Sequence, residues 1–335
     1  MGSPRDDNRL IRRRLFARHL GLGLRRSHES PGLALSDDFF CTTNDQTRPL
    51  DAVASKPSPM ASTAVSDSGL PDFAQPPVDE TALSLQFAPI PGFSIPHFGL
   101  YWERVRREYP HFEMQPPIAN VIEQFGQATA GTRQFGIAFA KAPDVRCWYL
   151  DQSRTRLAQV QRDRFVFNWR KVTGTEAYPR YPSLRASLER EWERFCAFLK
   201  DEKLDQPKVN QCEVVYVNNI EYEKGWSGYG ELDKVIASLA TPKAKSKFLP
   251  IPQRVSMQVT YPLEDNAGRL HVAFSPVIRG RDGKEVLQMT LTARGAPKSP
   301  SDDDIFAWLD LGRKWVVRGF ADFTTSEIHK IWEKQ

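Results

Sequence analysis

The residues best suited to binding chemistry lie in the stretch 163–181, which reads DRFVFNWRKVTGTEAYPRY. Its alternating pattern predicts a strand over 164–170, with Asn168 and Arg170 on one polar face and aromatic side chains on the other. Two guanidinium groups can grip a carboxylate or phosphate through paired hydrogen bonds, and tyrosines can stack on a ring. We therefore expect a ligand- or partner-binding site formed by Asn168, Arg170, Tyr178, Arg180 and Tyr181.

The same residues also fit a purely structural role. Asn168 would then satisfy the backbone of the following loop, and Arg170 would pair with a helix carboxylate such as Glu189. The two Tyr-Pro steps would only stiffen the connection to the next helix. Spacing alone does not separate these two interpretations, so both stay open at this point.

Further polar side chains alternate with apolar ones on strands expected around 254–261, 269–275 and 287–292. Gln258 and His271 belong to the polar side of this pattern and complete the expected binding site. Asn218 belongs to another polar and aromatic cluster, which follows a strand expected at 213–217. It would lie where the two halves of the chain meet, and ligand sites are common at such junctions.

The sequence lacks the motifs of common catalytic and metal sites. Its six histidines show no H-x-x-x-H or H-E-x-x-H spacing, and it has no Walker A, G-x-S-x-G or G-x-G-x-x-G motif. We expect no metal and no cofactor, and we favour a protein that is not an enzyme. The alternative is a hydrolase or transferase whose site is assembled in space from Arg170, Tyr178 and His271.

The positive charge of the chain is concentrated at its N-terminus. The formal net charge is +5 over 335 residues, and residues 1–28 hold eight arginines and two aspartates, a net of +6. The remaining residues therefore carry a net charge of −1. A body so close to neutral does not favour duplex DNA on a saddle-shaped sheet, and nucleic-acid binding is the third and least favoured possibility.

Composition predicts a disordered extension over residues 1–75, which are rich in Ser, Pro, Asp, Arg and Thr. Met60 is an alternative translation start within it. The four cysteines lack C-x-x-C spacing, which indicates a reducing, cytoplasmic setting. No stretch approaches the roughly 18 apolar residues of a membrane span.

The remaining sequence predicts two halves, 76–205 and 206–335, with the same order of elements: strand, helix, antiparallel strands and long helix. The long helices are expected from Tyr181 and after Ser301, and the strands of the first half at 82–87, 134–139, 145–150, 155–160 and 164–169. Strict alternation predicts an antiparallel sheet with helices on one face and a polar second face. The expected fold is α+β, an internal duplication forming one curved sheet. This order resembles TATA-binding-protein-like folds and, less closely, the helix-grip fold.

The motif F-x-F-N-W-R at 165–170, then Y-P-x-Y at 178–181 and a W-x-x-F helix, resembles an uncharacterised, sporadically distributed bacterial protein family. Further matches are Pro116-Pro117, the strand VVYVNNI at 214–220 and a tryptophan-rich closing helix. The resemblance covers about residues 80–332 and implies no established activity. Sporadic distribution is typical of genes that move with their partners. We therefore expect an accessory or antitoxin-like protein that binds a protein partner or small ligand through the polar sheet face and the segment 168–181.

Overall fold

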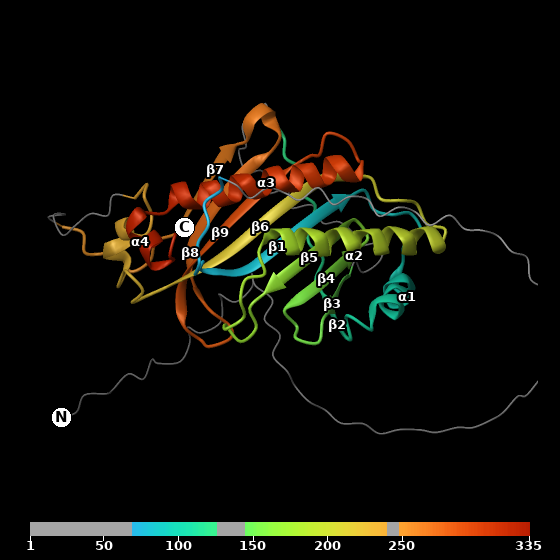
Figure 1. The fold of residues 1–335 in the computed structure, drawn as a ribbon, viewed down its shortest axis with the longest axis horizontal. Coiled ribbons are helices and arrows are strands. Elements are labelled where there is room, and N and C mark those ends of the chain that lie inside the picture. The colour runs from blue at the N-terminus through green and yellow to red at the C-terminus, as the bar shows by residue number, and fades with distance from the viewer. Residues whose placement is uncertain (1–68, 126–144, 240–247) are drawn as a thin grey trace, which may run out of the picture. The chain divides into compact units, whose positions relative to one another are not determined.

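A single antiparallel sheet of nine strands organises the described part of the chain (Figure 1). The computed structural model describes residues 69–125, 145–239 and 248–335, so the strand expected at 134–139 and the features of residues 1–68 lie outside it. The strand order is β2-β3-β4-β5-β1-β6-β9-β8-β7. The strands are β1 (Val78–Phe87), β2 (His111–Gln115), β3 (Arg146–Leu150), β4 (Arg156–Gln161), β5 (Arg164–Arg170), β6 (Val209–Glu221), β7 (Met257–Pro262), β8 (Arg269–Ile278) and β9 (Glu285–Gly295).

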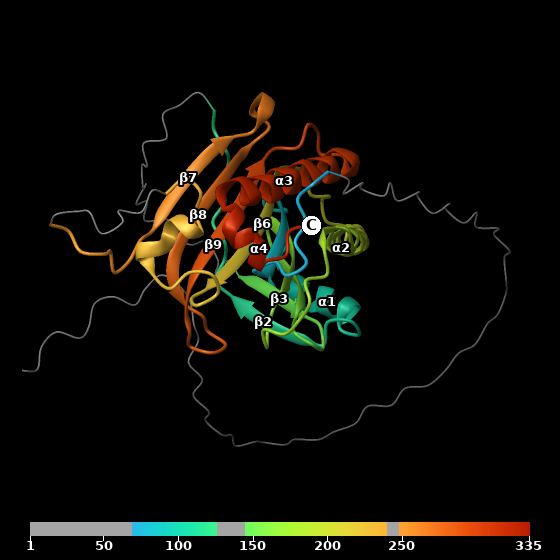
Figure 2. The ribbon, with the colours of Figure 1, turned by 60° about the vertical axis from the view of Figure 1, so that its left-hand side comes forward.

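Two long helices lie on the same face of this sheet (Figures 1 and 2). Helix α2 (Tyr181–Asp201) lies against β5, and α3 (Asp302–Phe323) lies against β6 and β9. The shorter helices are α1 (Ile95–Val105), which contacts β3, and α4 (Ser326–Ile331) near the C-terminus. The expected α+β class and antiparallel sheet are confirmed. Within the three described ranges, no helix is both long enough and apolar enough to cross a membrane.

The helix ends follow the local chemistry of the sequence. The Ser301 side chain accepts a hydrogen bond from the Asp304 backbone amide, and acidic residues occupy the first turn of α3. This arrangement satisfies a free amide and places negative charge at the positive end of the helix dipole. Thr325 caps α4 in the same way through the Ile328 amide. The predicted start of the long helix after Ser301 is confirmed.

Strand alternation separates the core from the polar face. In β1, Leu83, Leu85 and Phe87 are fully buried on the helix side. Burying an apolar side chain of this size contributes about 1.5–3 kcal/mol, which fixes the register because a one-residue slip would turn every such group outward. Ser84 and Gln86 leave the same strand on the opposite face. That face carries the polar residues described below.

Two elements differ from what the sequence indicates. The helix expected after the first strand of the second half is a short 3-10 segment, η1 (Tyr229–Lys234), whose backbone is irregular at Glu231. Glycines at 228 and 230 lower the helix propensity of this region. Strand β2 was not predicted, because its five residues stand between Pro110 and Pro116 and give too short a pattern.

Candidate functional site

The seven predicted site residues lie on opposite faces of the sheet. Asn168, Arg170, Gln258 and His271 belong to the polar face, whereas Tyr178, Arg180 and Tyr181 lie on the helix side. The division follows from β5, because Trp169 and Arg170 leave the strand in opposite directions. Tyr178 packs on Trp169, with 5.5 Å between ring centroids. Arg170, Tyr178 and His271 therefore do not form one site.

Asn168 and Arg170 are both held by neighbours on the polar face. The Asn168 carboxamide accepts from Gln159 at 2.6 Å and donates to Glu80 at 2.6 Å. Arg170 stacks on Trp148, with its guanidinium carbon 5.1 Å from the ring centroid. Glu189 pairs instead with Arg185 of its own helix at 3.1 Å.

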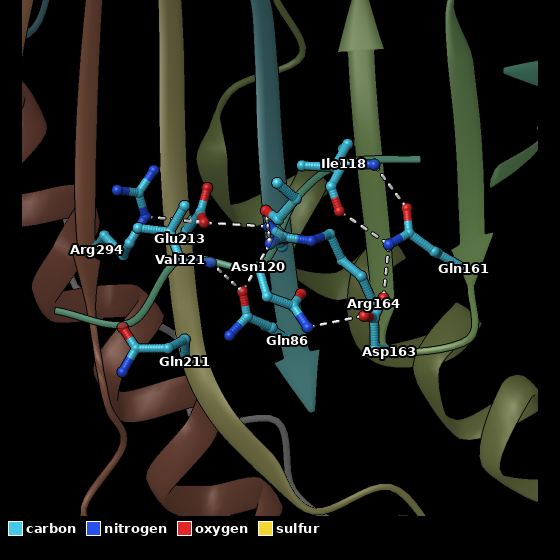
Figure 3. Close-up of polar contacts among 12 residues, drawn as sticks. Gln86, Ile118, Asn120, Val121, Gln161, Asp163, Arg164, Gln211, Glu213 and Arg294 are labelled. Atoms are coloured by element: carbon cyan, nitrogen blue, oxygen red, sulfur yellow. Dashed lines mark hydrogen bonds and ion pairs between the residues drawn. The ribbon is translucent and has the colours of Figure 1, made fainter. Parts of the chain in front are cut away.

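The most extensive polar feature is an extended segment, residues 116–125, which we call the strap. It follows β2 and crosses the polar face over β4, β5, β1, β6 and β9 (Figure 3). Its contacts reach β8 at the far end. The sequence pattern of residues 116–125 does not predict this use of the face.

Side chains from the sheet bind the strap through its backbone. The Gln161 carboxamide accepts from the Ile118 amide at 2.8 Å and donates to the Ile118 carbonyl at 2.9 Å. Arg164 donates to the Ala119 carbonyl at 3.2 Å, and Gln86 accepts from the Val121 amide at 3.0 Å. These hydrogen bonds are made to peptide groups of the strap and not to its side chains, so the same sheet residues could bind any extended segment of suitable length.

A buried charge cluster supports these contacts from below. Arg164 is only 2% exposed and contacts Glu213 at 3.1 Å and Gln86 at 2.7 Å. Glu213 also accepts from Arg294 at 2.9 Å. Because each charge has an oppositely charged partner, the cluster offsets much of the cost of desolvation and fixes the side chains that face the strap.

The strap ends at a carboxylate-binding group formed by Arg269, His271 and Arg294, which we call the seat. Glu123 contacts Arg269 at 2.5 Å, His271 at 2.7 Å and Arg294 at 3.4 Å. Burial acts to raise the pKa of the Glu123 carboxyl, but hydrogen bonds from Arg269 and His271 outweigh it and hold this pKa below its ordinary value. Thr260 of β7 lies 3.1 Å from the other ring nitrogen of His271 and orients it. The seat therefore favours an ionised acidic side chain.

Apolar packing contributes little to the position of the strap. Ile122 is 58% exposed and Val121 is 40% exposed, so neither is buried in the face. Polar contacts of this kind are only slightly better than contacts with water. Apart from the contacts of Glu123, the strap therefore has few strong contacts, and a second extended chain that brings its own carboxylate can compete for the same positions.

The helix side holds a cavity of about 150 Å³ that brings three predicted residues together. Tyr178 and Tyr216 join hydroxyl to hydroxyl at 2.7 Å, and Tyr181 donates to Asp310 at 2.8 Å. Burial raises the pKa of Tyr178 and Tyr181 well above the ordinary value, so both hydroxyls stay protonated. The polar lining residues are Asp72, Tyr178, Arg180, Tyr181, Tyr216, Asn218 and Arg313.

Several of these residues were missed because their neighbours are distant in the sequence. Arg313 of α3 and Tyr216 of β6 reach the cavity from the second half of the chain. Asn218 lies on β6 opposite Val78 of β1. Gln258, in contrast, stands exposed on the edge strand β7. Among the described ranges, no group of His, Cys, Asp and Glu has the arrangement of a metal site.

No protein-family model, no curated protein and no solved structure matches the chain.

Proposed function

We propose that this protein is a non-enzymatic binding protein whose polar sheet face recognises an extended, acidic segment of a protein partner. One observation carries the proposal: the face already binds an extended segment, the strap, through peptide groups and one carboxylate. An accessory or antitoxin-like role, in which this chain masks a segment of its partner, fits such recognition. The partner segment would displace the strap and place its own carboxylate in the seat.

The charges of the seat define the chemistry of the partner. Arg269, His271 and Arg294 converge on a single carboxylate, and all three are half-buried. Charge-assisted hydrogen bonds of this kind contribute roughly 1.5–3 kcal/mol each, about twice a neutral bond. An acidic residue at the position of Glu123 would therefore give most of the specificity for the partner segment. The contacts with its backbone would fix how far along the face that segment lies.

The other two candidate functions have less support. The separation of Tyr178 from Arg170 and His271 counts against the assembled hydrolase or transferase site. The polar face carries Glu80, Glu213 and Glu221 among its arginines, and a nucleic-acid backbone would meet these carboxylates.

We further propose that the two halves arose by duplication and form a saddle like that of TATA-binding proteins. The supporting observation is the strand order. Toward the centre of the sheet, the strands of one half follow the order β4-β5-β1, and the strands of the other half follow the corresponding order β8-β9-β6. Each half then ends in a long helix, α2 or α3, against its own strands.

A peptide with the sequence of residues 116–125, PPIANVIEQF, tests the binding function. In the wild-type chain the strap occupies the face at a high effective concentration, so the free peptide should bind weakly. Glu123→Gln removes the carboxylate of the strap and leaves the seat intact. We expect the Glu123→Gln chain to bind the labelled peptide at least about 10-fold more tightly than wild type, measured by fluorescence anisotropy.

The matched control is the same peptide with glutamine in place of its glutamate. It should bind the Glu123→Gln chain at least about 10-fold more weakly than the acidic peptide does, because it brings no carboxylate to the seat. Equal affinity of the two chains for the acidic peptide, or equal affinity of the two peptides for the Glu123→Gln chain, would contradict the proposal.

A further inference from the structure

A polar pocket of about 690 Å³ lies at the end of the sheet where β5 and β6 finish and β1 begins. Lys171, the residue directly after β5, and Asp79 of β1 belong to its lining. Gln86, which binds the strap, lies at the other end of β1, and the rise of an extended strand puts roughly 20 Å between it and Asp79. A ligand in this pocket would therefore not touch a segment bound on the polar face.

The side chain of Lys171 is left without a partner in this lining. Lys171 is half-buried, and within the described ranges no residue forms a hydrogen bond or an ion pair with its amine. Its backbone amide donates to the Asp79 carbonyl at 2.8 Å, so the two residues are neighbours in the sheet. Their opposite charges would pair if the Asp79 carboxylate were not engaged elsewhere.

The three carboxylates of the lining are all bound by other donors. Asp79 contacts the Arg281 guanidinium at 2.6 Å. The two oxygens of Glu221 contact cations at 2.6 and 2.9 Å. Glu176 accepts from backbone amides of its own loop at 2.8 and 2.9 Å. The Lys171 amine is close enough to all three to feel their charge, yet it has none of them as a counter-ion.

Arg281 is the group that takes the Asp79 carboxylate away from Lys171. Its guanidinium packs closely over Gly174, where a Cβ atom would stand 2.9 Å from Nε, so a side chain at this position would displace it. Burial lowers the pKa of the Lys171 amine, and the Arg281 charge acts in the same direction against the opposing effect of Asp79. A lysine held in this way has a larger neutral fraction, and the neutral amine is the nucleophile.

The rest of the lining favours a polar but uncharged ligand. Its other cations are already paired with carboxylates: Arg180, Lys224, Arg279 and Arg281. An anion would therefore find only Lys171 without a counter-ion. Gln75 and Asn219 bring amide groups to the lining, which suit the hydroxyls of a ligand. The volume lies within the range of roughly 300–1,000 Å³ that is typical of small-molecule sites.

We propose that Lys171 is a reversible covalent binding site for a small hydroxyl-bearing aldehyde in this pocket. The Lys171 nitrogen attacks the carbonyl carbon with its lone pair and forms a carbinolamine. The carbinolamine then loses its oxygen as water, which takes both protons of the neutral amine, and a carbon–nitrogen double bond remains. Addition of water reverses the step, so no oxidant, reductant or further reactant is consumed.

Reductive trapping on the full chain tests this site, with glyceraldehyde as the probe. Cyanoborohydride converts each imine to a stable secondary amine, and peptide mass spectrometry gives the rate of modification at each lysine. At pH 7 we expect Lys171 to react at least about 5-fold faster than the exposed Lys200 and Lys208. The difference should shrink toward pH 10, where ordinary lysine amines also lose their protons.

Arg281→Gln tests whether the arrangement of charges produces this reactivity. The Asp79 carboxylate is then released to pair with the Lys171 amine, so the rate at Lys171 should fall to that of the exposed lysines. Arg107→Gln, at an exposed arginine just after α1, removes the same charge and should leave the rate unchanged. Where Arg281→Gln does not fold, the pH profile of the wild-type chain decides.

Propanal has the same three carbons as glyceraldehyde without its hydroxyls, and it tests the class of ligand. The preference for Lys171 over the exposed lysines should be at least about 3-fold smaller with propanal, because the amide groups of the lining then have no hydroxyls to bind. Equal rates at Lys171 and the exposed lysines, an undiminished rate in the Arg281→Gln chain, or an equal preference with propanal would overturn the proposal.

Discussion

Replacement of Arg164 by methionine is expected to lower the free energy of unfolding by about 3 kcal/mol. Arg164 is 2% exposed and supplies hydrogen bonds to Ser84, Glu213 and Gln86 beneath the strap. Removing one partner of a buried ion pair usually costs 3–5 kcal/mol, because the remaining charge is left desolvated. Glu213 keeps Arg294 at 2.9 Å, so the loss should fall at the lower end of that range.

Urea denaturation of three variants checks this expectation. Arg156→Met is the matched control, since Arg156 is an exposed arginine on the neighbouring strand β4 and should change stability by less than about 0.5 kcal/mol. The double variant Arg164→Met/Glu213→Leu should be more stable than Arg164→Met alone, because the buried Glu213 carboxylate, which has lost Arg164 as a partner in the single variant, is then absent. A loss below about 1 kcal/mol for Arg164→Met would show that the buried cluster does not support the polar face.

Reversal of the charge at Arg269 is expected to reduce binding of the acidic peptide at least about 100-fold. In an Arg269→Glu variant a carboxylate would face the carboxylate of the peptide, and like charges at close range cost several kcal/mol. The test uses a chain that also carries Glu123→Gln, so that the strap does not mask the change. Arg269 contacts both the Glu123 carboxylate and the Gln124 carbonyl, at 2.5 and 2.6 Å.

A compensating peptide makes this test specific. A peptide with lysine in place of its glutamate should bind the reversed chain better than it binds the chain with Arg269 intact, because the pair is restored with opposite signs. Arg107→Glu, at an exposed arginine just after α1, makes the same change in net charge and should leave acidic-peptide binding unaltered. Loss of binding in both variants would point to a general charge effect rather than to the seat.

The strands of the sheet could be predicted because the alternation of side chains that indicates each strand lies within a few consecutive residues. In F-x-F-N-W-R, the aromatic residues Phe165, Phe167 and Trp169 take every second position, and burial of this aromatic set fixes which face of the strand meets the helices. The same alternation placed His271 on the polar face. The caps at Ser301 and Thr325 are equally local, since each is satisfied within one helical turn.

The contacts that define the sites are not local, and for that reason the sequence did not reveal them. Gln161 binds the strap 43 residues away, and His271 meets Glu123 across 148 residues. The strap itself, PPIANVIEQF, has neither helical nor strand periodicity and resembles an ordinary loop. Tyr178 was grouped with Arg170 because they are close in sequence, although the sheet separates them.

Hydrogen–deuterium exchange of the Glu123→Gln chain, with and without excess PPIANVIEQF, tests most directly whether the polar face binds an extended acidic segment. In the free chain, the Ile118 and Val121 amides are bonded to Gln161 and Gln86 and should be protected from exchange. Added peptide should accelerate exchange at both amides of the chain, because it takes over their partners. Binding of the peptide with no change at these amides would contradict the account.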